Sequence, residues 1–411
     1  LGNSRLVLAI STVFASPLLA VSGDDGGGFH FRGCSSMGKS TALYVAGSVW
    51  GGGGAAGYVR NWRATDNALE AVAALHNGPV LLLDEISQVE PKAAGAAAYM
   101  LANGLGKARA GKEGQARRGY QWRLLFVSTG EIALGDKVRE GGGQMAAGME
   151  VRVIDLRADA GAGLGLFENI GDAPDAASFA QRLREASGRF YGEPARAFFS
   201  LVVEDLPRIR DELKAARRAF VNDVLPGGAD GQVRRVCDRF ALVAAAGDLA
   251  SALGVTGWPV GSAREAVARC FRDWLKERGG AGSGEVAEAK RRLAQALEAY
   301  GASRFQKFHM NADRAVITPR WGFVKMRDEE EGGPLEDRTW FFLSGALREV
   351  LAGLDFRAMV AALMAEGVIV AQGKSGDPSK TFHVPNDGRK HRLFQINADA
   401  LLGVGGDDDG E

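Results

Sequence analysis

The segment Gly33-Cys34-Ser35-Ser36-Met37-Gly38-Lys39-Ser40 constrains this chain more than any other, because it fits the pattern G-x-x-x-x-G-K-[ST] at every fixed position. Such a segment is a phosphate-binding loop, in which backbone N–H groups face phosphate oxygens and a lysine reaches the β- and γ-phosphates. Residues 29–32 before it are typical of a strand, and residues 41–46 after it are typical of a helix. This context is the one that the motif requires, so the sequence predicts nucleotide binding.

The loop assigns an expected role to each of its residues. Lys39 is expected to act on the phosphates during catalysis, and Ser40 is expected to hold Mg²⁺. The residues predicted to bind ATP are Gly33, Ser35, Ser36, Gly38, Lys39, Ser40 and Thr41.

A second motif follows about forty residues later. The apolar run at 80–83 ends in Asp84 and Glu85, as expected of a buried parallel strand whose carboxyl end lies at the ligand crevice. Asp84 is predicted to bind Mg²⁺ and Glu85 to polarise the attacking water, so both are predicted catalytic residues. An N-cap followed by a solvated acid also explains the two carboxylates, but it leaves the preceding buried aliphatic residues unexplained.

A third strand is predicted at 123–127, directly before Ser128 and Thr129. In ATPases with an additional strand, a polar residue at this strand end senses the γ-phosphate. We therefore predict that Thr129 or Ser128 is the sensor, although the same residues are ordinary turn formers.

Composition limits the remaining possibilities. The 411 residues suggest two or three domains, and the 46% apolar content supplies a core for each. Lysine plus arginine and aspartate plus glutamate both total 50, so any nucleic-acid contact has to come from local clusters. Three widely spaced cysteines favour a reducing compartment over a disulfide framework or a zinc site.

The predicted fold class is α/β: a P-loop core with a parallel sheet, then an all-helical region and a winged-helix-like domain. The expected boundaries are 1–163 for the ATPase core with its N-terminal helix, 164–312 for a helical lid, 313–402 for the winged-helix-like domain and 403–411 for a disordered acidic tail. The apolar stretch at 6–21 is interpreted as a buried helix and not as a signal peptide or membrane span, because it is short and contains Pro17. A cytoplasmic location without membrane contact is therefore expected.

Several runs together resemble the domain of unknown function 927 family. They are the loop at 33–40 and the segments 48–51, 61–65, 67–70, 83–85, 99–104, 106–107, 128–131, 239–241, 257–259, 274–275, 278–280 and 303–305. Two positions depart from the family pattern: Ser40, where threonine is common, and Asp248, where related chains often have glutamate.

The resemblance implies an AAA+-type ATPase similar to superfamily 3 helicases, which occur in bacteria, phages and mobile elements. Such ATPases often follow a primase-like region in a longer polypeptide, which is consistent with a chain that starts at Leu1. The implied assembly is a homo-oligomeric ring, with a hexamer favoured.

A glycine-rich loop between Asn103 and Trp122 carries a local excess of cations. They are Lys107, Arg109, Lys112, Arg117 and Arg118, opposed only by Glu113. The loop resembles the hairpin that superfamily 3 helicases project into a central channel, so these five residues are predicted to bind nucleic-acid phosphates. Tyr120 or Trp122 could stack on a base, whereas a solvated charged loop is the alternative.

Ring ATPases complete their sites with an arginine from the neighbouring subunit. Arg152 is the first candidate for this catalytic arginine, with Arg139 and Arg109 as rivals, and Arg235 or Arg239 could be a second sensor. Each of these arginines could instead pair with a nearby acid.

The function predicted from the sequence is a ring-forming, ATP-dependent DNA translocase or helicase, acting on single-stranded or forked DNA in the replication of phage, plasmid or other mobile-element DNA. The alternative is an ATPase switch that binds DNA or a partner in a nucleotide-dependent manner without unwinding.

Overall fold

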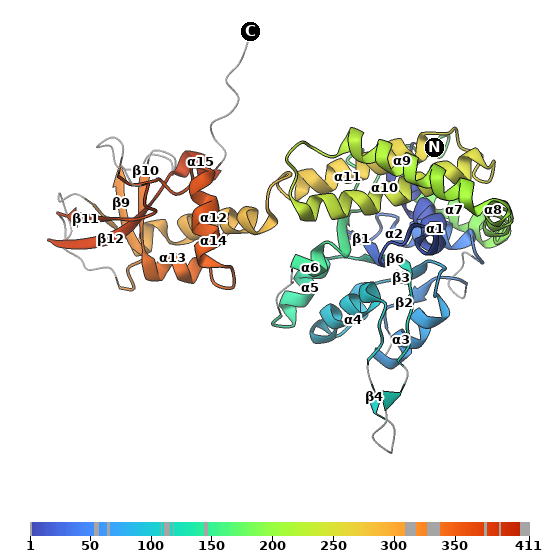
Figure 1. Ribbon diagram of the computed structural model, residues 1–411, viewed down its shortest axis with the longest axis horizontal. Helices are drawn as coiled ribbons and strands as arrows, with labels where there is room; N and C mark the ends of the chain where they lie inside the picture. Colours follow the sequence, from blue (N-terminus) through green and yellow to red (C-terminus); the bar gives the residue numbers. More distant parts are fainter. Residues whose placement is uncertain are drawn as a thin grey trace, which may run out of the picture. The chain divides into compact units, whose positions relative to one another are not determined.

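This computed structural model of the chain contains two compact units, Leu1–Ala281 and Gly282–Glu411, and each is described by itself (Figure 1). The structure describes residues 2–52, 57–63, 66–107, 109–110, 116–117, 119–143, 147–308, 318–326, 338–373, 376–385 and 388–402. The predicted acidic tail lies outside these residues.

The first unit is built on a five-stranded, fully parallel sheet with the order β2-β3-β6-β1-β7. Its strands are β1 (Gly27–Arg32), β2 (Arg60–Asn61), β3 (Leu81–Asp84), β6 (Leu125–Gly130) and β7 (Val153–Arg157). The strand that ends in the predicted sensor, β6, lies between the strand before the phosphate-binding loop and the strand that ends in the two acids. This order is the additional-strand arrangement expected from the sequence.

Helices cover both faces of this sheet. They are α1 (Ser4–Ser22), α2 (Lys39–Ser48), α3 (Asp66–Leu75), α4 (Pro91–Asn103), α5 (Leu134–Glu140), α6 (Ala147–Glu150), α7 (Ala176–Arg189), α8 (Glu193–Glu204), α9 (Leu206–Val224), α10 (Gly231–Ala252) and α11 (Ser262–Glu277), with a short 3₁₀ turn at Ile86–Gln88. The coarse prediction of an α/β fold with a parallel sheet and many helices is confirmed.

The apolar run at 80–83, which leads into and forms most of β3, is buried on both faces of the sheet. Val80 and Leu82 belong to the core that α1, α2 and α8–α11 help to build, whereas Leu81 and Leu83 belong to the core beneath α3, α4 and α5. Because alternate side chains of a strand point to opposite faces, a strand covered on both sides needs apolar residues throughout.

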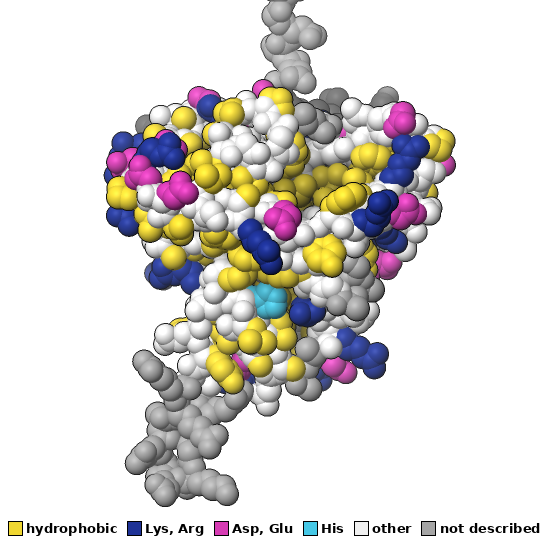
Figure 2. Space-filling view, turned by 90° about the vertical axis from the view of Figure 1, so that its right-hand side faces the viewer, with side chains coloured by type: hydrophobic (Ala, Val, Ile, Leu, Met, Phe, Trp, Pro, Cys, Tyr) yellow, Lys and Arg dark blue, Asp and Glu magenta, His cyan; other side chains and the backbone are white. Residues whose placement is uncertain are grey.

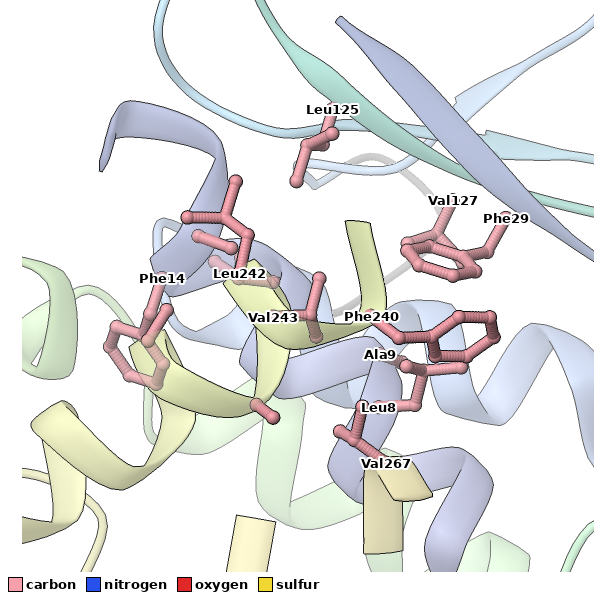
Figure 3. Packing of buried hydrophobic residues seen from close by; sticks show 14 of the residues in the cluster. Leu8, Ala9, Phe14, Phe29, Leu125, Val127, Phe240, Leu242, Val243 and Val267 are labelled. Atoms are coloured by element: carbon pink, nitrogen blue, oxygen red, sulfur yellow. The ribbon is translucent and has the colours of Figure 1, made fainter. Parts of the chain in front are cut away.

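Helix α1 is buried in the first of these cores. Among the described residues it is the one helix long and apolar enough to cross a membrane, yet 78% of its apolar window is buried. Figure 3 shows Leu8, Ala9 and Phe14 of α1 among Phe240 and Val243 of α10, next to side chains of β1 and β6. The expectation of a buried helix agrees with this packing, which is compatible with a cytoplasmic chain.

The helical region after β7 shares that core. Helices α9, α10 and α11 pack against one another and against α1, and α7 packs against α2. The predicted lid is thus joined to the sheet by the N-terminal helix, and the boundary near residue 163 stays a prediction.

The second unit contains a five-stranded sheet with the order β11-β12-β10-β9-β8. Its elements are α12 (Gly284–Arg304), β8 (Phe305–Lys307), β9 (Gly322–Met326), β10 (Arg338–Leu343), α13 (Ser344–Val350), α14 (Phe356–Ala365), β11 (Lys380–Val384), β12 (Arg389–Ile396) and α15 (Ala398–Leu402). A winged-helix-like domain is expected to contain helices followed by a hairpin, and α13, α14 and the antiparallel hairpin of β11 and β12 are present. The winged-helix-like assignment is not confirmed, because β8, β9 and β10 enlarge the sheet beyond a hairpin, and α12 packs with α13, α14 and α15.

Candidate nucleotide site

The phosphate-binding loop joins the carboxyl end of β1 to the amino end of α2. Gly38 has φ +89°, and a Cβ there would lie 3.0 Å from the Phe167 ring, so conformation and space both favour glycine. The Nζ of Lys39 donates to the carbonyls of Gly33 and Cys34, at 2.7 Å each. The lysine is therefore held against the loop's own backbone, within the segment that would surround a phosphate.

The hydroxyl of Ser40 and the carboxylate of Asp84 lie next to each other. Ser40 Oγ donates to Asp84 Oδ1 at 3.2 Å, although the two residues are 44 positions apart in the chain. Mg²⁺ prefers oxygen ligands and is usually held by one or two protein groups plus phosphates and water, so this pair fits the ion. No cluster of three or more metal-binding side chains occurs in the part of the chain that the structure describes.

Thr129 connects the two acidic residues at the end of β3. Its hydroxyl donates to Asp84 Oδ1 and accepts the backbone N–H of Glu85 at 3.1 Å. One threonine thus fixes the carboxylate predicted to bind metal and the backbone of the residue predicted to activate water. A change at this hydroxyl would move both groups.

Glu85 has an unusual backbone conformation. Its φ is 63° and its ψ is 77°, a left-handed region that non-glycine residues enter rarely and at a cost of about 1–3 kcal/mol. Ser87 Oγ donates to Glu85 Oε1 at 2.5 Å. The strain places the carboxylate beyond the end of β3, where the hydroxyl of Ser87 holds it.

Ser128 points away from these groups. Its Oγ accepts the indole N–H of Trp62 at 2.8 Å and lies 2.9 Å from Nδ1 of His30. Because His30 Nε2 lies 3.0 Å from the carbonyl of Ile132, which can only accept, Nε2 carries the proton and the Ser128 hydroxyl donates to Nδ1. Of the two predicted sensors, the structure brings Thr129 together with Asp84 and Glu85, and it places Ser128 in a buried network.

Burial sets the charge state of this network. Desolvation lowers the pKa of the fully buried His30 imidazole, and it raises the pKa of the neighbouring, partly buried carboxyl of Asp155. Neutral His30 and the hydroxyl of Ser128 therefore hold β1 and β6 together beneath the site.

The contacts of two residues at the site, Arg184 and Glu277, could not be predicted from the sequence. Arg184 of α7 donates from Nε to the buried Thr41 hydroxyl at 2.9 Å, across 143 residues. Glu277 at the end of α11 forms ion pairs with Arg32 and Arg157, the last residues of β1 and β7. No local pattern marks these residues, because the elements that carry them meet only in the folded chain.

Arg152 lies just before β7, at the amino end of the strands. Its Nη1 donates to the carbonyl of Gly148 at 2.9 Å, and its guanidinium lies 5.8 Å from the Tyr99 ring centre. The structure does not bring Arg152 to Lys39 or Asp84 of its own chain, and its role towards a neighbouring subunit stays a prediction. Arg139 pairs with Asp136 on the same helix.

Arg239 occupies the same amino edge. Its guanidinium donates to the carbonyls of Val151 and Gly26, the second at 3.0 Å. Burial lowers its pKa to about 10. These contacts place Arg239 at the opposite end of the strands from the phosphate-binding loop, so the idea that it acts as a second sensor is wrong.

The predicted basic loop contains an antiparallel pair of short strands, β4 (Arg109–Ala110) and β5 (Ala116–Arg117), which extends away from the sheet beside α3 and α4 (Figure 1). Arg109 pairs with Arg117 in register. Lys107 is exposed, while Lys112 and Arg118 lie outside the described residues. Tyr120 is 50% exposed, but Trp122 is buried and donates to the carbonyl of Leu101, so stacking of Trp122 on a base is wrong.

The rest of the surface shows no competing basic field on the face drawn in Figure 2. Lysine and arginine side chains alternate there with aspartate and glutamate, in line with the equal totals of the two kinds. Among the residues coloured in that view, charges of the two signs are therefore interspersed.

Comparisons with known proteins support these assignments at the level of family and fold. The family model described as a domain of unknown function (DUF927) matches residues 1–121, which confirms the resemblance recognised from the sequence for this part of the chain. A solved structure described as "SCCmec type IV Cch - active helicase" superposes with a TM-score of 0.70 and 19% sequence identity, covering 98% of this chain and 68% of that one. At this identity the likeness shows a shared fold. No curated protein matches the chain.

Proposed function

We propose that this chain, whose residues 1–121 match the DUF927 family, is a Mg²⁺-dependent ATPase that drives movement along DNA. One observation carries the proposal: Ser40, Asp84, Thr129 and Glu85 are linked by hydrogen bonds at one edge of the sheet, directly beside the phosphate-binding loop. Three separate chain segments supply these groups, and each group has the chemistry that phosphoryl transfer requires. The similarity to a solved helicase fold supports the same conclusion.

The loop would bind the triphosphate of ATP through its backbone N–H groups and through Lys39, which exchanges the carbonyls of Gly33 and Cys34 for phosphate oxygens. Ser40 and Asp84 would hold Mg²⁺, which neutralises charge on the phosphates. Glu85 would orient water and accept its proton once it leaves Ser87. Thr129 would then exchange its bond to Asp84 for one to the γ-phosphate, which makes it the sensor.

We further propose that the segment from Lys107 to Arg118, which contains β4 and β5, binds single-stranded DNA through Lys107, Arg109, Lys112, Arg117 and Arg118. Phosphate contacts of this kind supply sequence-independent affinity that falls with salt. An oligomeric ring, for which a hexamer is favoured, would place one such hairpin per subunit around the strand, and Arg152 would complete the neighbouring site.

The second unit is proposed to be winged-helix-like. Its order of α12, β10, α13, α14, β11 and β12 gives three helices and a three-stranded antiparallel sheet, and β8 and β9 extend that sheet. Helix α14 carries a single cation, Arg357, whereas β12 begins with Arg389 and Lys390. Contact with DNA phosphates would therefore come from the strands and not from this helix.

The test is ATP hydrolysis with and without single-stranded DNA, measured beside Lys39→Ala and Glu85→Gln. We expect DNA to stimulate turnover and both variants to abolish it, after which strand unwinding is assayed. Turnover that ignores DNA would favour the switch that binds a partner without unwinding. Absence of nucleotide binding in the folded wild-type chain would overturn the site itself.

A further inference from the structure

The base of the hairpin that carries β4 and β5 is closed by backbone hydrogen bonds. Gly106 N–H donates to the carbonyl of Tyr120 at 2.9 Å, and Trp122 N–H donates to the carbonyl of Gly104 at 3.0 Å. Gly104 has φ +73°, and a Cβ at this position would lie 2.2 Å from the Trp122 carbonyl oxygen. The two chain segments therefore meet at a fixed point directly after α4.

A buried carboxylate from α3 holds this base. Glu70 is 1% exposed, and its Oε1 accepts the backbone N–H of Lys107 at 3.1 Å. A Cβ on Gly106 would lie 3.1 Å from Glu70 Oε2, so glycine lets the carboxylate approach the backbone. A buried carboxylate is costly unless it is well paired, and Glu70 is placed where it fixes the first residue of the predicted DNA-binding hairpin.

Helix α3 is also in contact with the nucleotide side of the unit. Leu69, the neighbour of Glu70, belongs to the same buried cluster as Trp62 and Ile86. Trp62 donates from its backbone N–H to the carbonyl of Asp84 at 3.1 Å and from its indole N–H to Ser128 Oγ at 2.8 Å. A single tryptophan thus touches the ends of both strands that carry the predicted catalytic groups.

We propose that Trp62 and Glu70 are positioning residues that couple the state of the nucleotide to the position of the hairpin. The inference rests on the proposed ATPase function and names the residues through which the nucleotide site would act on the hairpin. A shift of β3 or β6 on hydrolysis displaces Trp62, α3 moves with Trp62 because their side chains share one core, and Glu70 transfers that displacement to Lys107. Energetic coupling between distant sites is carried by packed side chains, hydrogen bonds and rigid secondary-structure elements, and Trp62, α3 and Glu70 offer each of these.

The experiment measures ATP hydrolysis with and without single-stranded DNA for Glu70→Ala, Glu70→Gln and the control Glu90→Ala, which removes an exposed carboxylate of the same unit. Glu70→Ala is expected to keep the basal rate within about twofold and to lower the stimulation by DNA about fivefold or more, the scale of a typical coupling between sites. Glu70→Gln keeps an oxygen that accepts the Lys107 N–H, so it should restore most of the stimulation. Glu90→Ala should behave as wild type.

A second readout separates coupling from folding. The affinity for single-stranded DNA is measured with an ATP analogue and with ADP, and the ratio of the two affinities is compared between wild type, Glu70→Ala, Trp62→Phe and the double variant. If Trp62 and Glu70 act in series, either single substitution already breaks the coupling. The affinity ratio of the double variant should then be no smaller than that of the more strongly affected single variant.

The outcomes distinguish the inference from the function on which it rests. A folded Glu70→Ala chain with full DNA stimulation and an unchanged affinity ratio overturns the inference alone. The inference alone is also overturned if Glu70→Ala loses basal hydrolysis and Glu70→Gln does not restore it, because Glu70 is then merely structural. A wild-type chain that binds nucleotide but shows no response to DNA in either readout overturns both.

Discussion

The two edges of the parallel sheet use polar side chains in opposite ways. At the amino edge, side chains satisfy backbone groups: Arg239 donates to the carbonyls of Gly26 and Val151, while Ser16 donates to the carbonyl of Gly78 and accepts the N–H of Leu125. At the carboxyl edge, Lys39 and Thr129 also bond to backbone groups, but the side chains of Ser40, Asp84 and Thr129 contact one another as well. The bonds at the amino edge stabilise the fold, whereas the side chains at the carboxyl edge can exchange partners when a ligand binds.

The largest expected effect is at the carboxyl edge. Glu85→Gln should lower the rate of ATP hydrolysis by about 10²–10⁴-fold, because it removes the carboxylate that accepts a proton from water. Binding of nucleotide and the melting temperature should stay near those of wild type, as equilibrium binding and thermal melts would show. A large loss of stability would place Glu85 with the structural groups of the amino edge.

The next effect is at the amino edge. Arg239→Ala removes the donor to the part-buried carbonyls of Val151 and Gly26. Each lost bond to a charged group costs about 1.5–3 kcal/mol, so the unfolding free energy should fall by about 3 kcal/mol or more. Chemical denaturation gives this value. Below the new melting point, the hydrolysis rate per folded chain should remain within a few-fold of wild type. A loss of hydrolysis without a loss of stability would contradict the comparison.

A pair of adjacent residues makes the comparison sharper. Ser128→Ala leaves the Trp62 indole N–H and His30 Nδ1 without their partner, which should cost about 1–3 kcal/mol of stability. Thr129→Val keeps the shape but removes the hydroxyl, so it should lower the hydrolysis rate about tenfold or more with a smaller change in stability. The reverse pattern would make Ser128 the sensor.

The smallest effect depends on pH. Burial lowers the pKa of both His30 and His76 below the ordinary value near 6.5, so the unfolded chain binds protons first as pH falls. Stability contributed by these neutral rings is present above about pH 6.5 and decreases below it, by at most about 1.4 kcal/mol per pH unit for each ring. Denaturation curves from pH 7.5 to 5.5 should show this slope, and His30→Gln should reduce it. The raised pKa of Asp155 acts in the opposite direction and reduces the slope. A profile that is the same for wild type and His30→Gln would contradict the prediction.

Much of the candidate site could be predicted from the sequence because its motifs are local. The spacing of Gly33, Gly38 and Lys39 specifies the loop, and the apolar run before Asp84 and Glu85 specifies a strand end. The second unit was less predictable. The winged-helix-like prediction accounts for α13, α14 and the hairpin of β11 and β12, but not for β10 as a central strand, since the pairing of β10 with β12 joins Trp340 to Ile396, far apart in the chain.

The sequence by itself determined the phosphate-binding loop, the acidic strand end and the α/β class, because each depends on residues a few positions apart. Only the tertiary structure decided that Thr129 faces Asp84 while Ser128 faces His30, and that Arg239 belongs to the amino edge. It also decided that Trp62 and Glu70 lie between the two predicted sites. The physical reason is that adjacent strand residues point to opposite faces, and the partner on each face is set by the register and packing of distant segments.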